Sequence, residues 1–510
     1  MTDRQVLIAG AGPTGLVLAL WLTKLGVPVR IVDKLPAASS TSRALAVHAR
    51  TLELYCQAGL TEAVLEKGHK TPAVHLWVSG EEKASISFDN VGQGLTPYPF
   101  LHIYPQDEHE RLLSARLEAL GVRVERGVEV VGFAETVEGL TVRLKGPDGA
   151  ETTASAAYLA GCDGARSAVR HGMGVGYPGG TYRQLFYVAD VEAKGPAMNG
   201  DLNLDLEAAD FLAIFPLDEG RRARLIGTVR EDEGLDLDKL KFDDVSDRAI
   251  RDLKIEVTRV NWFSTYHVHH RVTERFRGGR AFLLGDAAHI HSPAGGQGMN
   301  TGIGDAINLA WKLAAVLAGR APDALLDSYE AERRAFAVRL VRSTDQGFSL
   351  ATAEGPVADL VRTRLVPLVL PAAAKVDDWR EFAFRTVSQI TLNYRNQPIS
   401  AGRAGEVHGG DRLPWVAPSP ENGGRDNFAP LARMVWQVHV YGEASPALTA
   451  WCADRGLPLE VFAWSPACAT RGLKAGAAYL LRPDTYVAMA EPSASPQALE
   501  AYFTRTGIRS

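Results

Sequence analysis

The sequence predicts an α/β protein with an inserted α+β domain, and three observations carry this prediction. Near its start, a short apolar run is followed by a glycine-rich turn, an apolar helix pattern and a second apolar run. Between residues 177 and 272, strand-like runs separated by charged turns interrupt this organisation. After residue 401, a second series of strand and helix patterns follows Pro- and Gly-rich stretches. Strands that alternate with helices favour a parallel sheet covered by helices.

Length, composition and charge narrow the class of protein. The chain has 510 residues, which suggests two to four domains at about 150 residues per domain. It is 46% hydrophobic and 23% charged, as globular proteins are, and its net charge of −5 gives no general attraction to nucleic acid or anionic lipid. Four cysteines lie far apart without a Cys-x-x-Cys pair, which excludes a disulfide scaffold or zinc ribbon and favours a cytoplasmic location.

The longest apolar run covers residues 6–22, where a signal peptide or membrane anchor is the alternative interpretation. Pro13 and three glycines interrupt this run, whereas a membrane helix needs continuous backbone pairing. No other window reaches the roughly 18 apolar residues that span a bilayer. We therefore expect a soluble protein with no membrane span.

The first sixty residues contain a dinucleotide-binding pattern. A strand at residues 5–9 leads into the turn Gly10-Ala11-Gly12-Pro13-Thr14-Gly15, then a helix to Gly26 and a second strand that ends in Asp33. The first glycine allows a tight turn, the second lets phosphate approach the backbone, and the third lets the helix pack on the strand. The helix N-terminus favours a pyrophosphate, and Asp33 suits ribose hydroxyls rather than a 2′-phosphate. FAD and NAD both satisfy this pattern.

A second glycine-rich segment follows an apolar strand at residues 279–285. Asp286 lies on the turn after the strand and suits a polyol chain, and residues 293–302 contain four glycines. A long helix is expected to begin near Ile303 and to end at Gly319. Bare backbone N–H groups before such a helix would face an anionic or electron-rich partner.

Together with residues 161–170 (GCDGARSAVR), these two segments resemble the three fingerprints of class A flavoprotein monooxygenases. The resemblance is to the para-hydroxybenzoate hydroxylase type, in particular its aromatic polyketide and phenol hydroxylase branches. It covers about residues 4–345 and implies FAD as the cofactor, with NAD(P)H as a transient electron donor. The lack of a second strand–GxGxxG–helix pattern downstream fits a donor without its own Rossmann domain.

The resemblance also implies which residues bind the cofactor. The first glycine-rich turn would hold the pyrophosphate, Asp33 and Lys34 the adenosine ribose, and the backbone of Val130 the adenine. Arg43 and Gln106 would reach the flavin, although taken singly each also suits an ordinary surface position. Asp163 and Arg166 have roles toward both FAD and NAD(P)H, Asp286 toward the ribityl or pyrophosphate region, and residues 293–300 border the isoalloxazine. The complete predicted set is Gly10, Gly12, Thr14, Gly15, Asp33, Lys34, Arg43, Gln106, Val130, Asp163, Asp286, Pro293, Gly296, Gly298, Met299 and Asn300.

The predicted domains follow the same resemblance. A discontinuous, Rossmann-like FAD-binding domain takes residues 1–176 and 273–350, and a substrate-binding sheet domain takes 177–272, where the apolar run 211–215 predicts a strand covered on both faces. A helical connector at 351–400 precedes a thioredoxin-like C-terminal domain at 401–510. Cys452 and Cys468 lie too far apart in sequence for dithiol chemistry, so a structural or dimer-supporting role is expected there.

The resemblance implies a monooxygenase that hydroxylates a phenolic or polycyclic aromatic substrate with O2, through a C4a-hydroperoxyflavin. The substrate would be small, flat and hydrophobic, and the protein a homodimer. The sequence identifies no catalytic base; His267, His269 and His270 are pocket candidates only, and the pair His289 and His291 lacks a third metal ligand. Alternatives are Baeyer–Villiger insertion or epoxidation, a flavin oxidase or reductase without oxygen insertion, and a FAD-bound scaffold without turnover.

Overall fold

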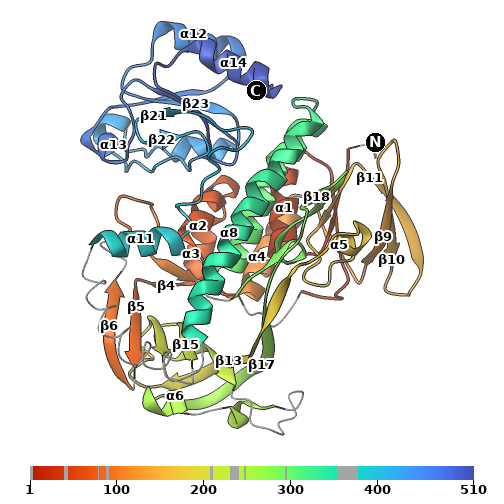
Figure 1. Cartoon of the computed structure of the whole chain (residues 1–510), viewed down its shortest axis with the longest axis vertical. Coiled ribbons are helices and arrows are strands. Elements are labelled where there is room, and N and C mark those ends of the chain that lie inside the picture. The colour runs from red at the N-terminus through yellow and green to blue at the C-terminus, as the bar shows by residue number, and fades with distance from the viewer. Residues whose placement is uncertain are drawn as a thin grey trace.

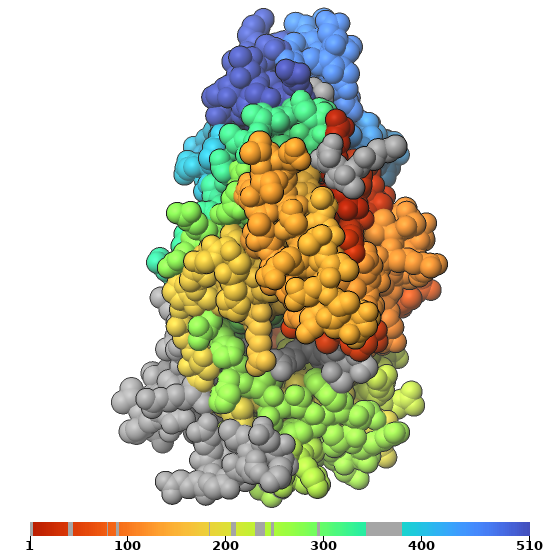
Figure 2. All heavy atoms as spheres, turned by 90° about the vertical axis from the view of Figure 1, so that its right-hand side faces the viewer, coloured from red at the N-terminus to blue at the C-terminus, as the bar shows by residue number. Residues whose placement is uncertain are grey.

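The computed structural model describes residues 4–38, 44–78, 80–87, 91–206, 211–229, 240–245, 248–292, 296–352 and 377–509. Three regions follow one another along the long axis of the molecule (Figure 1). A C-terminal region lies at one end, a parallel sheet with its helices in the middle, and a large, mostly antiparallel sheet at the other end. Figure 2 shows the same order from the side, with the C-terminal residues in blue at the top and the yellow and green residues of the large sheet below.

The parallel sheet is built around the first strand of the chain. Its order is β18-β19-β12-β1-β2-β8, and β1 pairs in parallel with both β2 and β12. Because both faces are covered, β1 and β12 are buried along their whole length, as their apolar runs predict. The strands are β1 (Val6–Ala9), β2 (Val29–Asp33), β8 (Val124–Arg126), β12 (Tyr158–Gly161), β18 (Arg277–Gly278) and β19 (Ala281–Leu283).

Helices cover this sheet and carry the glycine-rich segments. Helix α1 contacts both α4 and α7, and its buried residues belong to the main hydrophobic core together with β1 and β12. The helices of this region are α1 (Pro13–Lys24), α2 (Ala49–Tyr55), α3 (Thr61–Lys67), α4 (Gln106–Ala119), α5 (Ala168–Gly172), α7 (Gln297–Leu317) and α8 (Asp327–Thr352). Two three-stranded sheets flank it: β9 (Glu129–Glu135), β10 (Leu140–Lys145) and β11 (Glu151–Ala156), and β3 (Ala46–Val47), β4 (His69–Thr71) and β7 (Leu101–Ile103).

The predicted start of the long helix near Ile303 is wrong, because α7 begins at Gln297. Gly296, which caps the helix, has a left-handed backbone with φ of +62° and turns the chain into the helix at this earlier point. Gly298 and Gly302 therefore lie inside the first two turns instead of before the helix. Glycine is a poor helix former, so the sequence pattern placed the start too late.

The large sheet, here called the covering sheet, contains the strands predicted between residues 177 and 272. Its order is β20-β17-β13-β16-β15-β14-β5-β6. Alternate residues of β15 belong to two different hydrophobic clusters, which confirms a strand covered on both faces. The elements are β5 (Ala73–Val78), β6 (Glu81–Ser87), β13 (Gly179–Lys194), β14 (Leu202–Leu206), β15 (Phe211–Pro216), β16 (Arg222–Val229), α6 (Arg248–Asp252), β17 (Glu256–Val272) and β20 (His289–Ile290). The predicted domain boundaries stay a prediction, and β5 and β6 join this sheet from outside the predicted range.

The C-terminal region follows α11 (Asp377–Val387) and has a sheet of order β22-β21-β26-β25-β23-β24. Strands β23 and β24 are parallel, whereas β25 is antiparallel to both β23 and β26. This βαβαββα succession supports the thioredoxin-like prediction, which stays a prediction. The elements are β21 (Ala401–Ala404), β22 (Val407–His408), β23 (Gln437–Tyr441), α12 (Pro446–Arg455), β24 (Leu459–Phe462), α13 (Pro466–Thr470), β25 (Ala478–Leu481), β26 (Val487–Glu491) and α14 (Pro496–Thr506).

The predicted membrane alternative at residues 6–22 falls on β1 and α1, which are parts of the packed core. Among the described residues, none of the helices combines the length and apolar character that crossing a bilayer requires.

Candidate functional site

The first glycine-rich turn has the close packing that its three glycines predict. Gly10 has φ of +97°, and a Cβ placed there would overlap the carbonyl oxygen of Cys162. A Cβ on Gly15 would overlap the carbonyl oxygen of Gly10, so α1 lies directly against the turn. Gly12, by contrast, has no heavy atom of the described residues within 4 Å of the position its Cβ would take. The helix N-terminus is thus open at Gly12, where an anionic group can approach the backbone.

Thr14 joins the first turn to the second glycine-rich segment. A Cβ on Gly302 would overlap the Thr14 hydroxyl, and one on Gly285 would lie 2.7 Å from it. Both glycines therefore let α7 and the turn before Asp286 pack closely on the start of α1. This contact brings the two segments to one place, although they lie far apart in the sequence.

A cavity of about 220 Å³ lies at the carboxyl ends of β1, β2 and β12, and the predicted adenosine-side residues line it. The Asp33 carboxylate accepts hydrogen bonds from the N–H groups of Ala11 (2.6 Å) and Leu35 (2.8 Å), so it also fixes the turn. Oδ2 of Asp163 accepts from the N–H groups of Ala168 and Val169, whereas its Oδ1 is buried without a partner among the described residues. The lining includes Gly10, Asp33, Lys34, Val130, Asp163 and Arg166.

A larger cavity of about 650 Å³ begins on the other side of the turn and extends to the covering sheet. It brings together residues predicted for the pyrophosphate, the ribityl chain and the flavin, namely Gly12, Thr14, Gln106, Asp286, Gly296, Gly298 and Met299. The two cavities share Cys162 and Gly164 in their walls. A long ligand can therefore run from the adenosine side, past the helix N-terminus at Gly12, to the covering sheet.

Asn300 differs from the other predicted residues because its side chain is fully engaged by the protein. Its Oδ1 accepts from the His48 N–H (2.9 Å) and the Thr51 hydroxyl (2.7 Å), and its Nδ2 donates to the carbonyls of Ala46 and Gly296. This residue thus fastens the segment 46–51 to the start of α7. Asn300 is absent from the cavity lining, and its side chain has no remaining donor to offer a ligand, so the predicted contact with the flavin is not placed there. Arg43 and Pro293 lie outside the described residues.

The wall opposite α7 is aromatic and was not predicted residue by residue. Trp262, Ser264, Tyr266 and Val268 alternate along β17, and all four line the larger cavity. Phe215 and Ile226 extend this wall from β15 and β16. The alternation in residues 262–268 indicates that these side chains share one face of a strand. The sequence does not show whether that face of the sheet is turned toward the cofactor. Of the three pocket candidates, His267 and His269 line the cavity, whereas His270 is not part of its lining.

His289 and His291 belong to a buried polar chain beside this cavity. Nε2 of His289 lies 2.7 Å from Asp305, whose other oxygen accepts from Arg333 at 2.6 Å. The rings of His289 and His291 stack with centroids 6.0 Å apart. Burial and the neighbouring His289 lower the pKa of His291 to about 4, so this imidazole is neutral at physiological pH. Within the described part of the chain, no three His, Cys, Asp or Glu side chains are grouped to hold a metal ion.

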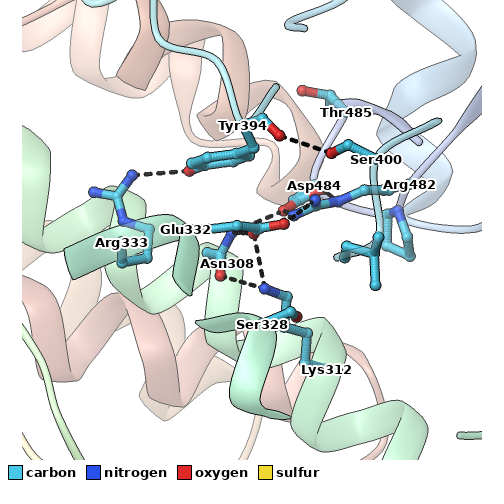
Figure 3. Close-up of polar contacts among 12 residues, drawn as sticks. Asn308, Lys312, Ser328, Glu332, Arg333, Tyr394, Ser400, Arg482, Asp484 and Thr485 are labelled. Carbon is cyan, nitrogen blue, oxygen red and sulfur yellow. Dashed lines mark hydrogen bonds and ion pairs between the residues drawn. The ribbon is translucent and has the colours of Figure 1, made fainter. Parts of the chain in front are cut away.

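A buried ion cluster joins this region to the C-terminal region (Figure 3). It consists of Asn308 and Lys312 on α7, Glu332 on α8, and Arg482 and Asp484 after β25. Glu332 lies 2.8 Å from Lys312 and 2.6 Å from Arg482, and Arg482 also pairs with Asp484. The four charges balance, which is what a buried cluster requires. Next to it, Arg333 donates to the Tyr394 hydroxyl at 2.8 Å (Figure 3). The series of polar contacts that begins at His289 therefore also reaches the segment before β21.

We expect acid to weaken the protein through Glu332. Burial by itself would raise its pKa, but the charges of Arg482 and Lys312 outweigh that effect and lower the pKa of Glu332 to about 2. The unfolded chain, with a glutamate pKa near 4.5, therefore binds more protons than the folded chain between these values. This contribution to stability is complete above pH 4.5 and is lost as the pH falls toward 2. Urea unfolding across this range should show a steeper loss for the wild type than for Glu332→Gln; equal slopes would contradict the assignment.

Comparisons with known proteins agree with this geometry. A protein family described as FAD binding domain matches residues 3–344. A 6-methylpretetramide 4-monooxygenase from Streptomyces rimosus is 37% identical over 80% of this chain and 73% of that protein. A pentachlorophenol 4-monooxygenase from Sphingobium chlorophenolicum is 30% identical over 82% of this chain and 77% of that protein. The solved structure of an anhydrotetracycline hydroxylase from Streptomyces rimosus superposes with a TM-score of 0.78 and 29% identity, over 99% of this chain and 100% of that one. The chain therefore belongs to the FAD-binding domain family, among the class A flavin monooxygenases.

Proposed function

We propose that this protein is a FAD-dependent, NAD(P)H-consuming monooxygenase that hydroxylates a phenolic or polycyclic aromatic substrate. The observation that carries the proposal is the cavity of about 650 Å³, which has the open helix N-terminus on one wall and aromatic side chains on the other. Relatives named as monooxygenases of tetracycline precursors and of pentachlorophenol support an aromatic substrate. Dioxygen as co-substrate, a homodimer and a cytoplasmic location are further parts of the proposal.

The residues present fit FAD. The open backbone at Gly12 would face the pyrophosphate, and the buried, unpartnered Oδ1 of Asp163 lies in the wall of the adenosine-side cavity. Lys34 and Val130 would border the adenosine, while Gln106, Asp286 and residues 296–299 would border the flavin half. When bound, FAD supplies hydride acceptance from NAD(P)H and activation of dioxygen, which amino-acid side chains do not supply.

The protein itself orients the substrate and keeps water away from it. The wall of Phe215, Ile226, Trp262 and Tyr266 would hold a flat ring opposite the start of α7. Backbone N–H groups at the start of α7 can stabilise negative charge that develops on the ring system they face. An apolar wall also limits solvent access, which favours transfer of oxygen to the substrate over release of peroxide.

The proposal is tested by anaerobic titration of the purified protein with NADPH and by aerobic turnover with phenols. We expect yellow protein, bleaching without oxygen, and NADPH oxidation that an aromatic substrate stimulates. Oxidation that yields only peroxide across a broad phenol series would favour a flavin oxidase. A lack of bleaching would favour a FAD-bound scaffold without turnover. A ketone substrate converted to an ester would favour Baeyer–Villiger insertion.

Replacing Trp262 by alanine should weaken substrate binding without loss of FAD. The indole borders the cavity, and the guanidinium of Arg224 lies 5.6 Å from its ring. Loss of one aromatic contact costs on the order of 1.4 kcal/mol, so we expect the KM for the substrate to rise about tenfold, with more peroxide per NADPH. Phe263→Ala is the matched control, because Phe263 belongs to the hydrophobic cluster on the other face of the covering sheet. An unchanged KM in Trp262→Ala would contradict this placement of the substrate.

A further inference from the structure

Four arginines line a cavity of about 400 Å³ that is separate from both cofactor cavities. It lies where α11 meets the C-terminal region, and Figure 1 shows α13 directly above α11 on this side of the molecule. The arginines are Arg385, Arg395, Arg412 and Arg471. Four guanidinium groups around one cavity repel one another unless carboxylates or a bound anion neutralise them.

Two of these four guanidinium groups make bidentate pairs with carboxylates, although the Glu53 carboxylate also pairs with Arg50 at 3.2 Å. Arg412 makes a bidentate pair with Glu53 on α2, at 2.5 and 2.8 Å, and Arg395 makes one with Asp411, also at 2.5 and 2.8 Å. Glu406, the other carboxylate in the lining, already pairs with Arg403 at 2.9 Å. The acidic residues of the cavity wall are therefore all engaged with partners.

Arg471 is the exception. Among the described residues, its guanidinium has neither a carboxylate partner nor a hydrogen-bond acceptor, although it is half-buried and lies over the backbone of Gly94. Burial and the nearby charge of Arg385 lower the pKa of Arg471, the charge of Glu381, which is paired with Arg385, opposes this shift, and the charge of Arg412 adds to it. Its position at the end of the five-residue helix α13 places it near helix carbonyls, but none of them accepts from its side chain.

Arg385, which lines the same cavity, has a hydrogen-bond donor that no described residue accepts from. Its Nη2 pairs with Glu381, while its Nε is buried and has no partner among the described residues. A buried N–H donor without an acceptor is costly, and the planar fork of arginine matches the oxygens of phosphate and carboxylate. Ile390, Leu392, Pro414 and Trp415 complete the wall with apolar surface.

We propose that this cavity binds a small molecule through an oxyanion group, phosphate or carboxylate, held by Arg471 and Arg385. The anion neutralises the guanidinium of Arg471, which has no carboxylate partner among the described residues, and supplies acceptors for the unused donors of both arginines. The apolar wall accommodates the rest of the ligand. Because Arg412 of this cavity is bound to Glu53 on α2, the site is connected to the FAD-binding half of the molecule.

The test is calorimetric titration of the FAD-loaded protein with inorganic phosphate, pyrophosphate and citrate at constant ionic strength. We expect saturable binding of at least one probe, and the comparison of pyrophosphate with citrate tells phosphate from carboxylate ligands. Arg471→Gln should weaken this binding at least tenfold. Arg143→Gln is the matched control, because Arg143 is an exposed arginine on β10 far along the chain from this cavity.

Thermal unfolding gives a second readout that does not depend on hydroxylation. The bound anion should raise the Tm of the wild type, since a ligand that binds only the folded state stabilises it, and should leave the Tm of Arg471→Gln unchanged. Equal FAD content in both proteins shows that the variant is folded. Saturable binding of none of the three probes, or equal weakening in Arg471→Gln and Arg143→Gln, would overturn the proposal. Neither outcome bears on the proposed monooxygenase activity.

Discussion

Replacing Gly12 by valine is expected to abolish FAD binding while leaving the fold intact. In the described part of the chain, no heavy atom lies within 4 Å of the position of a Cβ on Gly12. Its φ of −73° suits any residue, so the folded protein has room for the side chain. That same room is where the pyrophosphate would meet the helix N-terminus. We expect the Kd for FAD to rise at least a hundredfold, about 2.7 kcal/mol, in a fluorescence titration of the apoprotein.

A matched control for this variant comes from the same turn. Gly15→Ala places its Cβ on the carbonyl oxygen of Gly10, so it should disturb folding as well as cofactor binding. Gly12→Val should instead keep the circular dichroism spectrum and the urea midpoint of the wild-type apoprotein. Unchanged FAD affinity in Gly12→Val would show that the cofactor does not approach this backbone.

Replacing Glu332 by glutamine is expected to cost about 3–5 kcal/mol of unfolding free energy. The change leaves Lys312 and Arg482 with only Asp484 as an opposing charge in the buried ion cluster. Burial lowers the pKa of Lys312 to about 8 even though Glu332 raises it, so without Glu332 the buried amine must either lose its proton or stay charged without that partner, and both are costly. Urea unfolding at pH 7, followed by tryptophan fluorescence, measures the loss.

The double variant Glu332→Gln with Lys312→Met is the control for this prediction. It restores the charge balance of the cluster, so it should be less destabilised than the sum of the two single variants. The ring centroids of Trp311 and Trp436 lie 5.6 Å apart at the same junction, so tryptophan fluorescence reports on its opening. A loss below about 1 kcal/mol in Glu332→Gln would contradict the view that this cluster fastens the C-terminal region to α7 and α8.

Much of the fold could be predicted from local patterns. The apolar run and the turn at Gly10 to Gly15 specify a strand–turn–helix unit through short-range sterics, and the structure has β1 and α1 there. In the C-terminal region, Ser445 and Ser495 each precede a proline and cap α12 and α14, which is a local signal of a helix start. These features depend on a few neighbouring residues, so the sequence shows them directly.

The rest depends on contacts between distant segments. The start of α7 was misplaced because only the fold shows that Gly296 takes the left-handed conformation. The aromatic cavity wall depends on the register of β17 against β13, which shifts at three points. The pairing of Glu332 with Arg482 joins residues 150 positions apart, and no local pattern predicts it. That no described carboxylate pairs with Arg471 is visible only once its neighbours are placed.

The most direct test of the account is turnover of an aromatic substrate with NADPH under isotopically labelled dioxygen, followed by mass analysis of the product. If the groove between Gly12 and Trp262 holds a flavin that transfers oxygen, the product gains one labelled oxygen atom and FAD-free protein yields none. A product with oxygen from water, or oxygenation that persists in FAD-free protein, would contradict the account.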